Sequence, residues 1–157
     1  MPELTHIDEQ GRARMVDVSQ KDATRRIARA QAVLTMQPET VRRIQDNTLA
    51  KGDALTVARV AGILAAKRVD ELIPLCHTLP LSDVSVDFDF AETSVTITTQ
   101  AVTVSQTGVE MEALAAATLA ALTLYDMAKA IDKTMELGGV HLLLKTGGKS
   151  GDFVWKT

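Results

Sequence analysis

The sequence predicts an α+β domain with an antiparallel sheet, and three observations support this. The segments 84–90 and 95–104 alternate apolar and polar residues on either side of the turn "AETS", which predicts a hairpin with one face in water. Strands are also expected near 25–36 and at 138–145, so the strands come from three regions of the chain. The segment 107–132 has the length and spacing of a helix. Helices placed on one side of such a sheet give an α+β fold.

The N-terminal half contains an irregular arm and two helices. Residues 1–20 are polar and lack a regular period, whereas 25–36 fits two periods, of which we favour a strand over the second half. Pro38 suits the first turn of a short helix in "PETVRRIQ". Asp53 is placed to cap a helix over 53–68, in which one stripe holds Val57, Val60, Ala61 and Leu64.

The C-terminal half supplies the hairpin, a long helix and a last strand. Thr107 and Glu110 have the spacing of a capping box at the start of the long helix. The last strand leads into a glycine-rich tail at about 146–157. No repeat, low-complexity tract or linker divides the chain, which predicts a single domain over 1–157. One face of the first hairpin strand holds Val84, Val86, Phe88 and Phe90.

Composition narrows the class of protein. Hydrophobic residues make up 46% of the 157 residues but aromatic residues only 3%, so small aliphatic side chains must build the core, which favours close packing of helices. A net charge of −3 argues against a protein that coats nucleic acid or anionic membrane. An anionic small molecule can still bind where lysines and arginines cluster.

The sequence also predicts a cytoplasmic protein. A single cysteine cannot form a disulfide within the chain. The polar N-terminus lacks the apolar core of a signal peptide. The longest uncharged helical stretch, Ala113–Tyr125, is shorter than the ~20 residues that span a bilayer.

Three charged positions on the predicted helices are candidates for chemistry. Lys51 precedes a helix start, where free N–H groups and a lysine can bind an anion, although a solvated turn lysine gives the same pattern. Glu112 is either a surface carboxylate or an acceptor for a ligand's N–H groups. Asp126 and Lys129 can pair on one helix face, either as an exposed ion pair or with the lysine partly desolvated and its pKa lowered toward neutrality.

The separation of these positions has a consequence for assembly. Glu112 and Lys129 are 17 residues apart, which is about 25 Å along a helix. If both serve one small substrate, two copies of the chain must contribute to each site. The alanine-rich surface between them is expected to pack in such an oligomer, and it comprises Ala113, Ala116, Ala117, Ala120 and Ala121.

Two further segments have functional interpretations. "IPLCHTLP" places Cys76 beside His77 between two prolines, and the sequence contains no C-x-x-C or H-x-x-x-H pair, which argues against a metal site. His77 therefore contacts a ligand or is a satisfied core histidine. "GGKS" is similar to the end of a P-loop, but that pattern requires glycine where Leu143 stands and a following helix, so we reject it. The basic tail can close over phosphates or remain disordered.

Six blocks occur together and in order: "MVDV", "KGD", "LIPLCH", "TGVEMEAL", "LYDMAKA" and "GGKSGD". This set resembles the cyclic pyranopterin monophosphate synthase family of molybdenum cofactor biosynthesis, from about Leu4 to Phe153. The resemblance implies a ferredoxin-like fold and a homohexamer, a trimer of dimers with sites shared between subunits. It also implies a lyase that converts the 3′,8-cyclic dihydro derivative of GTP into cyclic pyranopterin monophosphate and pyrophosphate, with no metal or other cofactor.

The resemblance also assigns residues to the site. It implies Lys51, Asp126 and Lys129 as catalytic residues, together with His77 as the working side chain of its loop. The substrate-binding residues that it implies are Leu75, Cys76, His77, Met111, Glu112, Arg26, Lys145 and Lys149.

Two positions depart from the family pattern, and two other classes of function compete with it. Thr78 stands where proline is expected, which bears on the rigidity of the loop, and Ala128 where cysteine is expected, which indicates that a neighbouring thiol is not needed. Since fold does not fix function, a non-catalytic oligomeric module that binds an anionic nucleotide-like ligand is the alternative. A metal-dependent hydrolase is disfavoured by the sparse ligands.

Overall fold

The computed structural model describes residues 5–157 and contains a five-stranded antiparallel sheet with the strand order β2-β3-β1-β4-β5. Along the chain the elements are β1 (Thr24–Thr35), α1 (Pro38–Gln45), α2 (Ala54–Ala66), α3 (Val69–Leu72), β2 (Leu81–Phe90), β3 (Ser94–Ser105), α4 (Glu110–Ala128), β4 (Glu136–Thr146) and β5 (Phe153–Val154).

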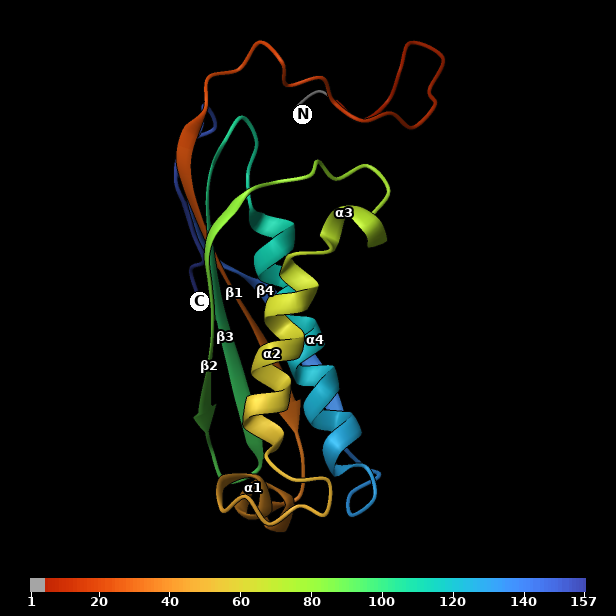
Figure 1. The fold of residues 1–157 in the computed structure, drawn as a ribbon, viewed down its shortest axis with the longest axis vertical. Coiled ribbons are helices and arrows are strands. Elements are labelled where there is room, and N and C mark those ends of the chain that lie inside the picture. The colour runs from red at the N-terminus through yellow and green to blue at the C-terminus, as the bar shows by residue number, and fades with distance from the viewer. Residues whose placement is uncertain (1–4) are drawn as a thin grey trace.

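The topology is ferredoxin-like. β1 is connected through α2 to β2, and β3 through α4 to β4, so two split β-α-β units interleave in the order β2-β3-β1-β4. α2 and α4 lie side by side on the same face of the sheet, with α1 at one end of the molecule and the N-terminal arm at the other (Figure 1). The predicted α+β fold with helices on one face is therefore confirmed.

Small side chains bring α2 and α4 into close contact. A Cβ added at Gly62 would lie 2.9 Å from the carbonyl oxygen of Ala116 and 3.3 Å from the Cβ of Ala120. The five alanines predicted to form an oligomer surface are fully buried within the single chain, so that prediction was wrong. They cannot reach a second copy, because α4 packs against the sheet on one side and α2 on another.

Three of the larger apolar side chains of α2 are exposed to solvent. Asp53 caps this helix as predicted, because its carboxylate accepts the N–H of Thr56 at 3.1 Å. The fully buried residues of the helix are all small, Leu55 and Ile63 pack against the core while partly buried, and most of the predicted stripe is in contact with solvent. The α2 apolar face consists of Val57, Val60 and Leu64, which are 44%, 51% and 47% exposed.

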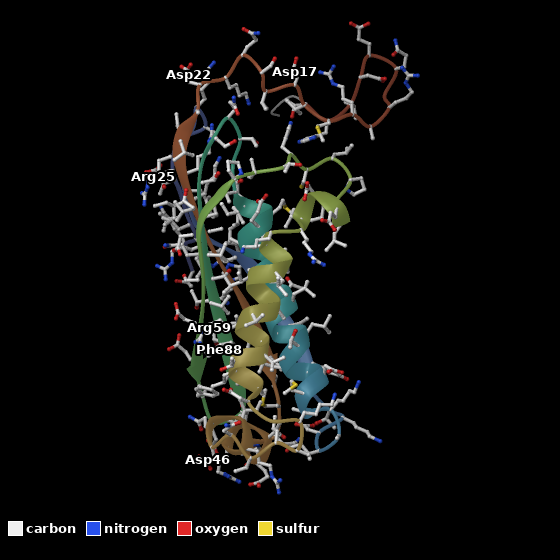
Figure 2. The ribbon with its side chains drawn as sticks, in the orientation of Figure 1. Asp17, Asp22, Arg25, Asp46, Arg59 and Phe88 are labelled. Atoms are coloured by element: carbon white, nitrogen blue, oxygen red, sulfur yellow. The ribbon has the colours of Figure 1, made fainter. Side chains whose placement is uncertain are left out.

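Arg59 connects α2 to the edge strand of the sheet. Its Nε donates to the carbonyl oxygen of Val86 at 3.0 Å, and its guanidinium lies 5.4 Å from the centre of the Phe88 ring. Figure 2 shows the two side chains next to each other between helix and strand. This contact combines a hydrogen bond with a cation–π interaction and holds β2 against the helix layer.

Several element boundaries differ from the sequence predictions. The whole of β1 is strand, rather than its second half, because it pairs with β3 and β4 on both sides. The predicted capping box was wrong: α4 begins at Glu110 after Val109, too late for Thr107 to cap it, and it ends at Ala128 rather than 132. β5 was not predicted, and it extends the sheet beyond β4. The short helix from Pro38 and the hairpin are confirmed.

Among residues 5–157, α4 is the one helix whose length and apolar composition match a membrane span. Half of it is buried within the fold, as is usual for the core helix of a globular domain.

Gly62→Ala should destabilise the fold, because the added methyl group pushes against the α4 backbone and against Val86 Cγ2 at 3.1 Å. We expect the free energy of unfolding in urea to fall by roughly 1–3 kcal/mol, despite the better helix propensity of alanine. Gly138→Ala is the matched control, since its added Cβ meets nothing within 4 Å. Equal stability of the two variants would contradict the close packing.

Candidate active site

Most of the candidate residues gather in two places at opposite ends of α4. The first turn of the helix contributes to a cavity that also contains His77, and the last turn contributes to a cluster of charged side chains. Figure 1 shows the helix running between these two ends of the molecule. A helix of 19 residues is about 28 Å long, so the expected separation of Glu112 from Lys129 is confirmed.

The histidine cavity has a volume of about 270 Å³ and is closed by the N-terminal arm. The α3–β2 loop and the start of α4 form one wall, and the arm forms the other. The lining residues are Thr5, His6, Val16, Val18, Lys21, Leu75, Cys76, His77, Leu79, Thr107, Gly108, Glu110, Met111 and Glu112.

The loop that carries Cys76 and His77 is tied back to α3. The hydroxyl of Thr78 donates to the carboxylate of Asp70 at 2.5 Å, and the N–H of Cys76 donates to the carbonyl oxygen of Ile73 at 3.1 Å. Proline is expected at this position and would restrict the loop through its ring. Thr78 instead restricts the loop through a hydrogen bond. Ala128, the other departure, is fully buried.

His77 links the loop to the arm. Its Nε2 lies 2.6 Å from the carbonyl oxygen of Val16. Because a carbonyl oxygen only accepts, Nε2 must carry the proton and donate it, which leaves Nδ1 as an acceptor in the neutral ring. The arm therefore fixes the tautomer of the imidazole, and this contact between His77 and the arm was not foreseen from the sequence.

Glu112 is a buried carboxyl group at the wall of the cavity, only 4% exposed. Burial raises its pKa to about 7, and the negative charges of Glu110 and Asp70 act in the same direction. Of the two sequence interpretations, the surface carboxylate is excluded. Near neutral pH the group is therefore present in both its protonated and its charged form. Burial also raises the pKa of the Cys76 thiol, with contributions from the same carboxylates at Glu112 and Asp70.

Lys145 joins the tail to the start of α4. Its Nζ lies 3.4 Å from Glu110 Oε1 and donates to the hydroxyl of Ser150 at 2.6 Å. Glu110 therefore serves as an ion-pair partner beside the cavity rather than as a helix cap. The tail is folded in this structure, so of the two predictions for it, terminal disorder does not hold.

Basic side chains also surround a second cavity, the tail pocket, of about 490 Å³. Arg26 is fixed there by main-chain carbonyls, donating to Ser105 at 3.1 Å and Gln106 at 3.2 Å, and within residues 5–157 it forms no ion pair. A Cβ at Gly148 would collide with this guanidinium, so the glycine permits the tail to cross it. The lining residues are Gln20, Lys21, Asp22, Thr24, Arg26, Gly148, Lys149 and Ser150.

At the other end of α4, Asp126 bridges two lysines in the lysine–aspartate cluster (Lys51, Asp126 and Lys129). Lys129 Nζ donates to Asp126 Oδ1 at 2.7 Å and Lys51 Nζ to Oδ2 at 3.1 Å. Lys51 also donates to the Asp126 carbonyl at 3.0 Å, which satisfies a free C=O at the helix end. Lys51 is thus turned toward the end of α4 rather than toward the start of α2.

Within this cluster, the aspartate and the lysines stabilise one another's charged forms. Hydrogen bonds from Lys129 and Lys51 hold the pKa of Asp126 below its usual value, and the bond to Asp126 raises the pKa of Lys129. Of the two interpretations of this pair, the structure contains the exposed ion pair. The alternative with a lowered Lys129 pKa is wrong, because the lysine side chain is 55% exposed and contacts a carboxylate instead of an apolar surface. Lys129 is a cation at neutral pH.

The structure thus groups the predicted residues in three sets. Leu75, Cys76, His77, Met111 and Glu112 share the histidine cavity, with Lys145 beside it. Arg26 and Lys149 share the tail pocket, and the lysine–aspartate cluster lies apart from both. Sequence reasoning missed Lys21, which lines both cavities, and the arm residues around His6. "MVDV" in the arm was the only sequence signal that pointed there.

Among residues 5–157, no group of three or more histidine, cysteine, aspartate and glutamate side chains is placed to hold a metal ion. That the chain works without a metal or other cofactor stays a prediction.

Comparison with known proteins gives the family. The model of the MoaC family matches residues 15–148. The chain is 55% identical to the cyclic pyranopterin monophosphate synthase of Brevibacillus brevis over 96% of this chain and 95% of that protein. It is 55% identical to the protein of the same name from Roseiflexus sp. over 98% and 99%, and 53% identical to that of Listeria innocua over 96% and 95%. The chain belongs to the MoaC family.

Replacing Glu112 by glutamine should make the protein more stable at high pH and not at low pH. The carboxyl group favours folding while protonated, and this contribution is lost as the pH rises from its ordinary pKa of 4.5 to about 7. Relative to wild type, Glu112→Gln should gain up to about 3 kcal/mol in the free energy of unfolding between pH 4 and pH 8.

Urea unfolding at a series of pH values measures this difference. Glu92→Gln, in the exposed β2–β3 turn, is the matched control and should run parallel to wild type. Parallel curves for Glu112→Gln would mean that the carboxyl group is not buried in solution.

Proposed function

We propose that this chain is a lyase that converts (8S)-3′,8-cyclo-7,8-dihydroguanosine 5′-triphosphate into cyclic pyranopterin monophosphate and pyrophosphate, in molybdenum cofactor biosynthesis. The observation that carries this proposal is identity above 50%, over nearly the full chain, to several proteins named cyclic pyranopterin monophosphate synthase. The reaction rebuilds a guanine-derived ring and closes a cyclic phosphate, so it needs proton transfers and an anion clamp.

The histidine cavity is the proposed binding site for the guanine-derived ring. Its buried carboxyl group at Glu112 accepts the N–H donors of the base and, with a pKa of about 7, returns a proton to it. His77 presents Nδ1 as an acceptor, because Nε2 is engaged by the arm. Leu75, Cys76 and Met111 form the walls that exclude water.

The triphosphate is proposed to lie toward the tail. Arg26, Lys145 and Lys149 supply positive charge there, and we add Lys21 because it lines both the histidine cavity and the tail pocket. Arg26 is prepared for this role, since main-chain carbonyls fix its guanidinium without neutralising it. Fixed cations of this kind bind phosphates without the cost of ordering a flexible side chain.

The lysine–aspartate cluster is the proposed catalytic group. Asp126 holds both lysines in one place and keeps Lys129 charged, so Lys129 acts as a proton donor or as an electrostatic stabiliser of developing negative charge. Lys51 faces the same carboxylate and is the second candidate for proton transfer.

A shared site between subunits reconciles these assignments. The histidine cavity and the lysine–aspartate cluster lie at opposite ends of a 19-residue helix, which is too long for one small substrate to span. We propose that the cavity of one copy meets the cluster of another in a cytoplasmic homohexamer, a trimer of dimers. The α2 apolar face supports such contacts, since three neighbouring large apolar side chains remain uncovered on the single chain.

Lys129→Ala should abolish turnover while leaving substrate binding largely intact. Losing a positioned general acid lowers kcat on the order of 10²–10⁴-fold. The assay measures pyrophosphate release and the pterin product, by fluorescence after oxidation, from the 3′,8-cyclic dihydro-GTP substrate. Lys133→Ala, at an exposed lysine four residues on, is the matched control and should turn over normally. Absence of turnover by folded wild type that still binds substrate would favour the non-catalytic binding module.

Mixed oligomers should regain activity that neither parent has. Glu112→Ala and Lys129→Ala each remove one half of a shared site, so random mixing leaves both halves intact in about a quarter of the sites. The measurement is pyrophosphate release after the two variants are unfolded, mixed and refolded together, with each variant refolded alone as the control. No recovery in well-folded mixtures would place each complete site within one chain.

A further inference from the structure

A buried carboxylate lies just beyond the catalytic end of α4. Asp132 is 4% exposed, although aspartate is rarely buried without a cation. Its Oδ1 accepts the N–H of Thr134 at 2.9 Å and the hydroxyl of the same residue at 2.8 Å. Its Oδ2 accepts the N–H of Gln37 at 2.8 Å and the hydroxyl of Thr40 at 3.0 Å. Four donors therefore satisfy the group.

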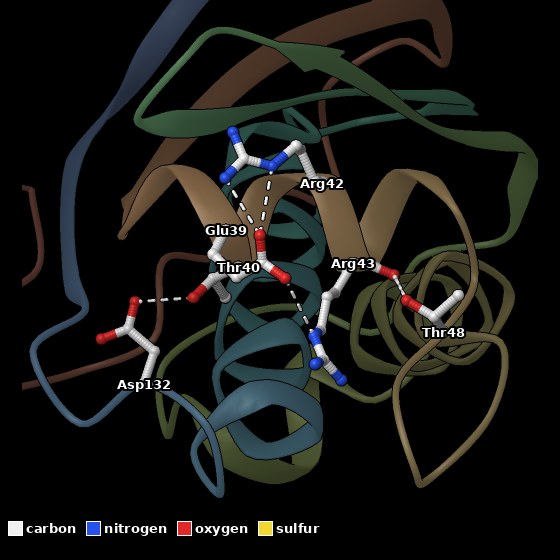
Figure 3. Close-up of polar contacts among 6 residues, drawn as sticks. All are labelled: Glu39, Thr40, Arg42, Arg43, Thr48 and Asp132. Atoms are coloured by element: carbon white, nitrogen blue, oxygen red, sulfur yellow. Dashed lines mark hydrogen bonds and ion pairs between the residues drawn. The ribbon is translucent and has the colours of Figure 1, made fainter.

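These bonds join two segments that are distant in sequence. Gln37 and Thr40 lie at the start of α1, and the Gln37 side chain makes no cap hydrogen bond of its own. Asp132, from the turn after α4, accepts the N–H of the N-cap residue Gln37, which is the donor that the N3 side chain accepts in a capping box, and it also accepts the hydroxyl of Thr40. Figure 3 shows the Asp132 carboxylate reaching from this turn to Thr40 on α1.

The lysine–aspartate cluster lies on elements that continue from these two segments. Lys129 lies three residues before Asp132, and Lys51 lies on the connection from α1 to α2. The cluster itself is open to solvent, with its three side chains between 46% and 55% exposed. Exposed ion pairs fix geometry only weakly, so the cluster cannot hold these segments in place by itself. A buried carboxylate with four hydrogen bonds can hold the two segments in place.

We propose that Asp132 is a positioning residue, which holds the turn after α4 against the start of α1 so that Lys51 and Lys129 meet at Asp126. This inference rests on the proposed function for its effect on catalysis, but its geometric part does not. Although burial opposes its charge, the hydrogen bonds from Gln37, Thr134 and Thr40 keep the pKa of Asp132 below its usual value. Asp132 is therefore charged at neutral pH and keeps these hydrogen bonds.

Asp132→Asn tests the proposal with almost no change of shape. One carboxylate oxygen becomes an NH₂ group. This group faces donors and cannot accept from them, so the hydrogen bonds on that side of the carboxylate are lost. Thr40→Val removes a single hydroxyl from the same contact, and Thr40→Ser restores a hydroxyl. Thr99→Val is the matched stability control, because its buried hydroxyl donates to the Ala113 carbonyl at 2.6 Å, away from the cluster.

The first readout is the titration of Asp126, followed by carbon-13 NMR of its carboxyl group in the full-length protein. In wild type the two lysines keep this pKa low. It should rise toward the usual aspartate value in Asp132→Asn and Thr40→Val, and remain low in Thr40→Ser and Thr99→Val. An unchanged Asp126 titration in folded Asp132→Asn or Thr40→Val, or an equal rise in Thr99→Val, would overturn the proposal.

The second readout is kcat/KM on the same set of variants. Misplacement of a catalytic group by about an ångström costs on the order of 10²-fold, so Asp132→Asn should lose roughly that much. In a Lys51→Ala background the further loss should be small, since both changes act through one cluster. A full additional loss there would overturn the positioning role. If wild type shows no turnover, the proposed function fails, but the Asp126 titration still decides this inference.

Discussion

The structure depends on the close approach of α2 and α4. Gly62 and the alanines of α4 allow the two backbones to come nearly into contact, and the same alanines let α4 lie flat on the centre of the sheet. A helix embedded in this way behaves as a rigid rod. Candidate site residues lie at both ends of the rod, so the packing that stabilises the fold also fixes how far apart the cavity and the cluster lie.

The sequence predicted most of the elements because their periods are strong. The hairpin alternates strictly, and Pro38 and Asp53 mark helix starts that the structure contains. The prediction failed where tertiary contacts override local pattern. The start of β1 is strand because β3 pairs with it from Thr24 and β4 from Ile27, and α4 begins after Val109 in spite of the capping-box spacing. In α2, the choice of buried face follows the need for small residues against α4, which a hydrophobic stripe cannot reveal.

The site was predictable in its parts but not in its environment. The resemblance supplied the residues, and the helix spacing alone gave the separation between Glu112 and Lys129. The protonation behaviour of these residues depends on which of them are buried, and the sequence did not show this. Glu112 is desolvated and Lys129 is not, although both are charged residues next to apolar ones in the sequence. The arm contacts of His77 and the role of Lys21 depend on a non-local fold of an irregular segment, for which the sequence has no periodic signal.

The pairing of β5 with β4 determines how the glycine-rich tail is held beside Arg26. The two strands close the glycine-rich segment between Thr146 and Phe153 at both ends, and several of its glycines adopt positive φ angles. Closing this loop costs conformational entropy that glycine makes especially large. The contacts that add β5 to the sheet offset this cost, and the loop beside Arg26 is held at both ends by the pairing of β4 with β5.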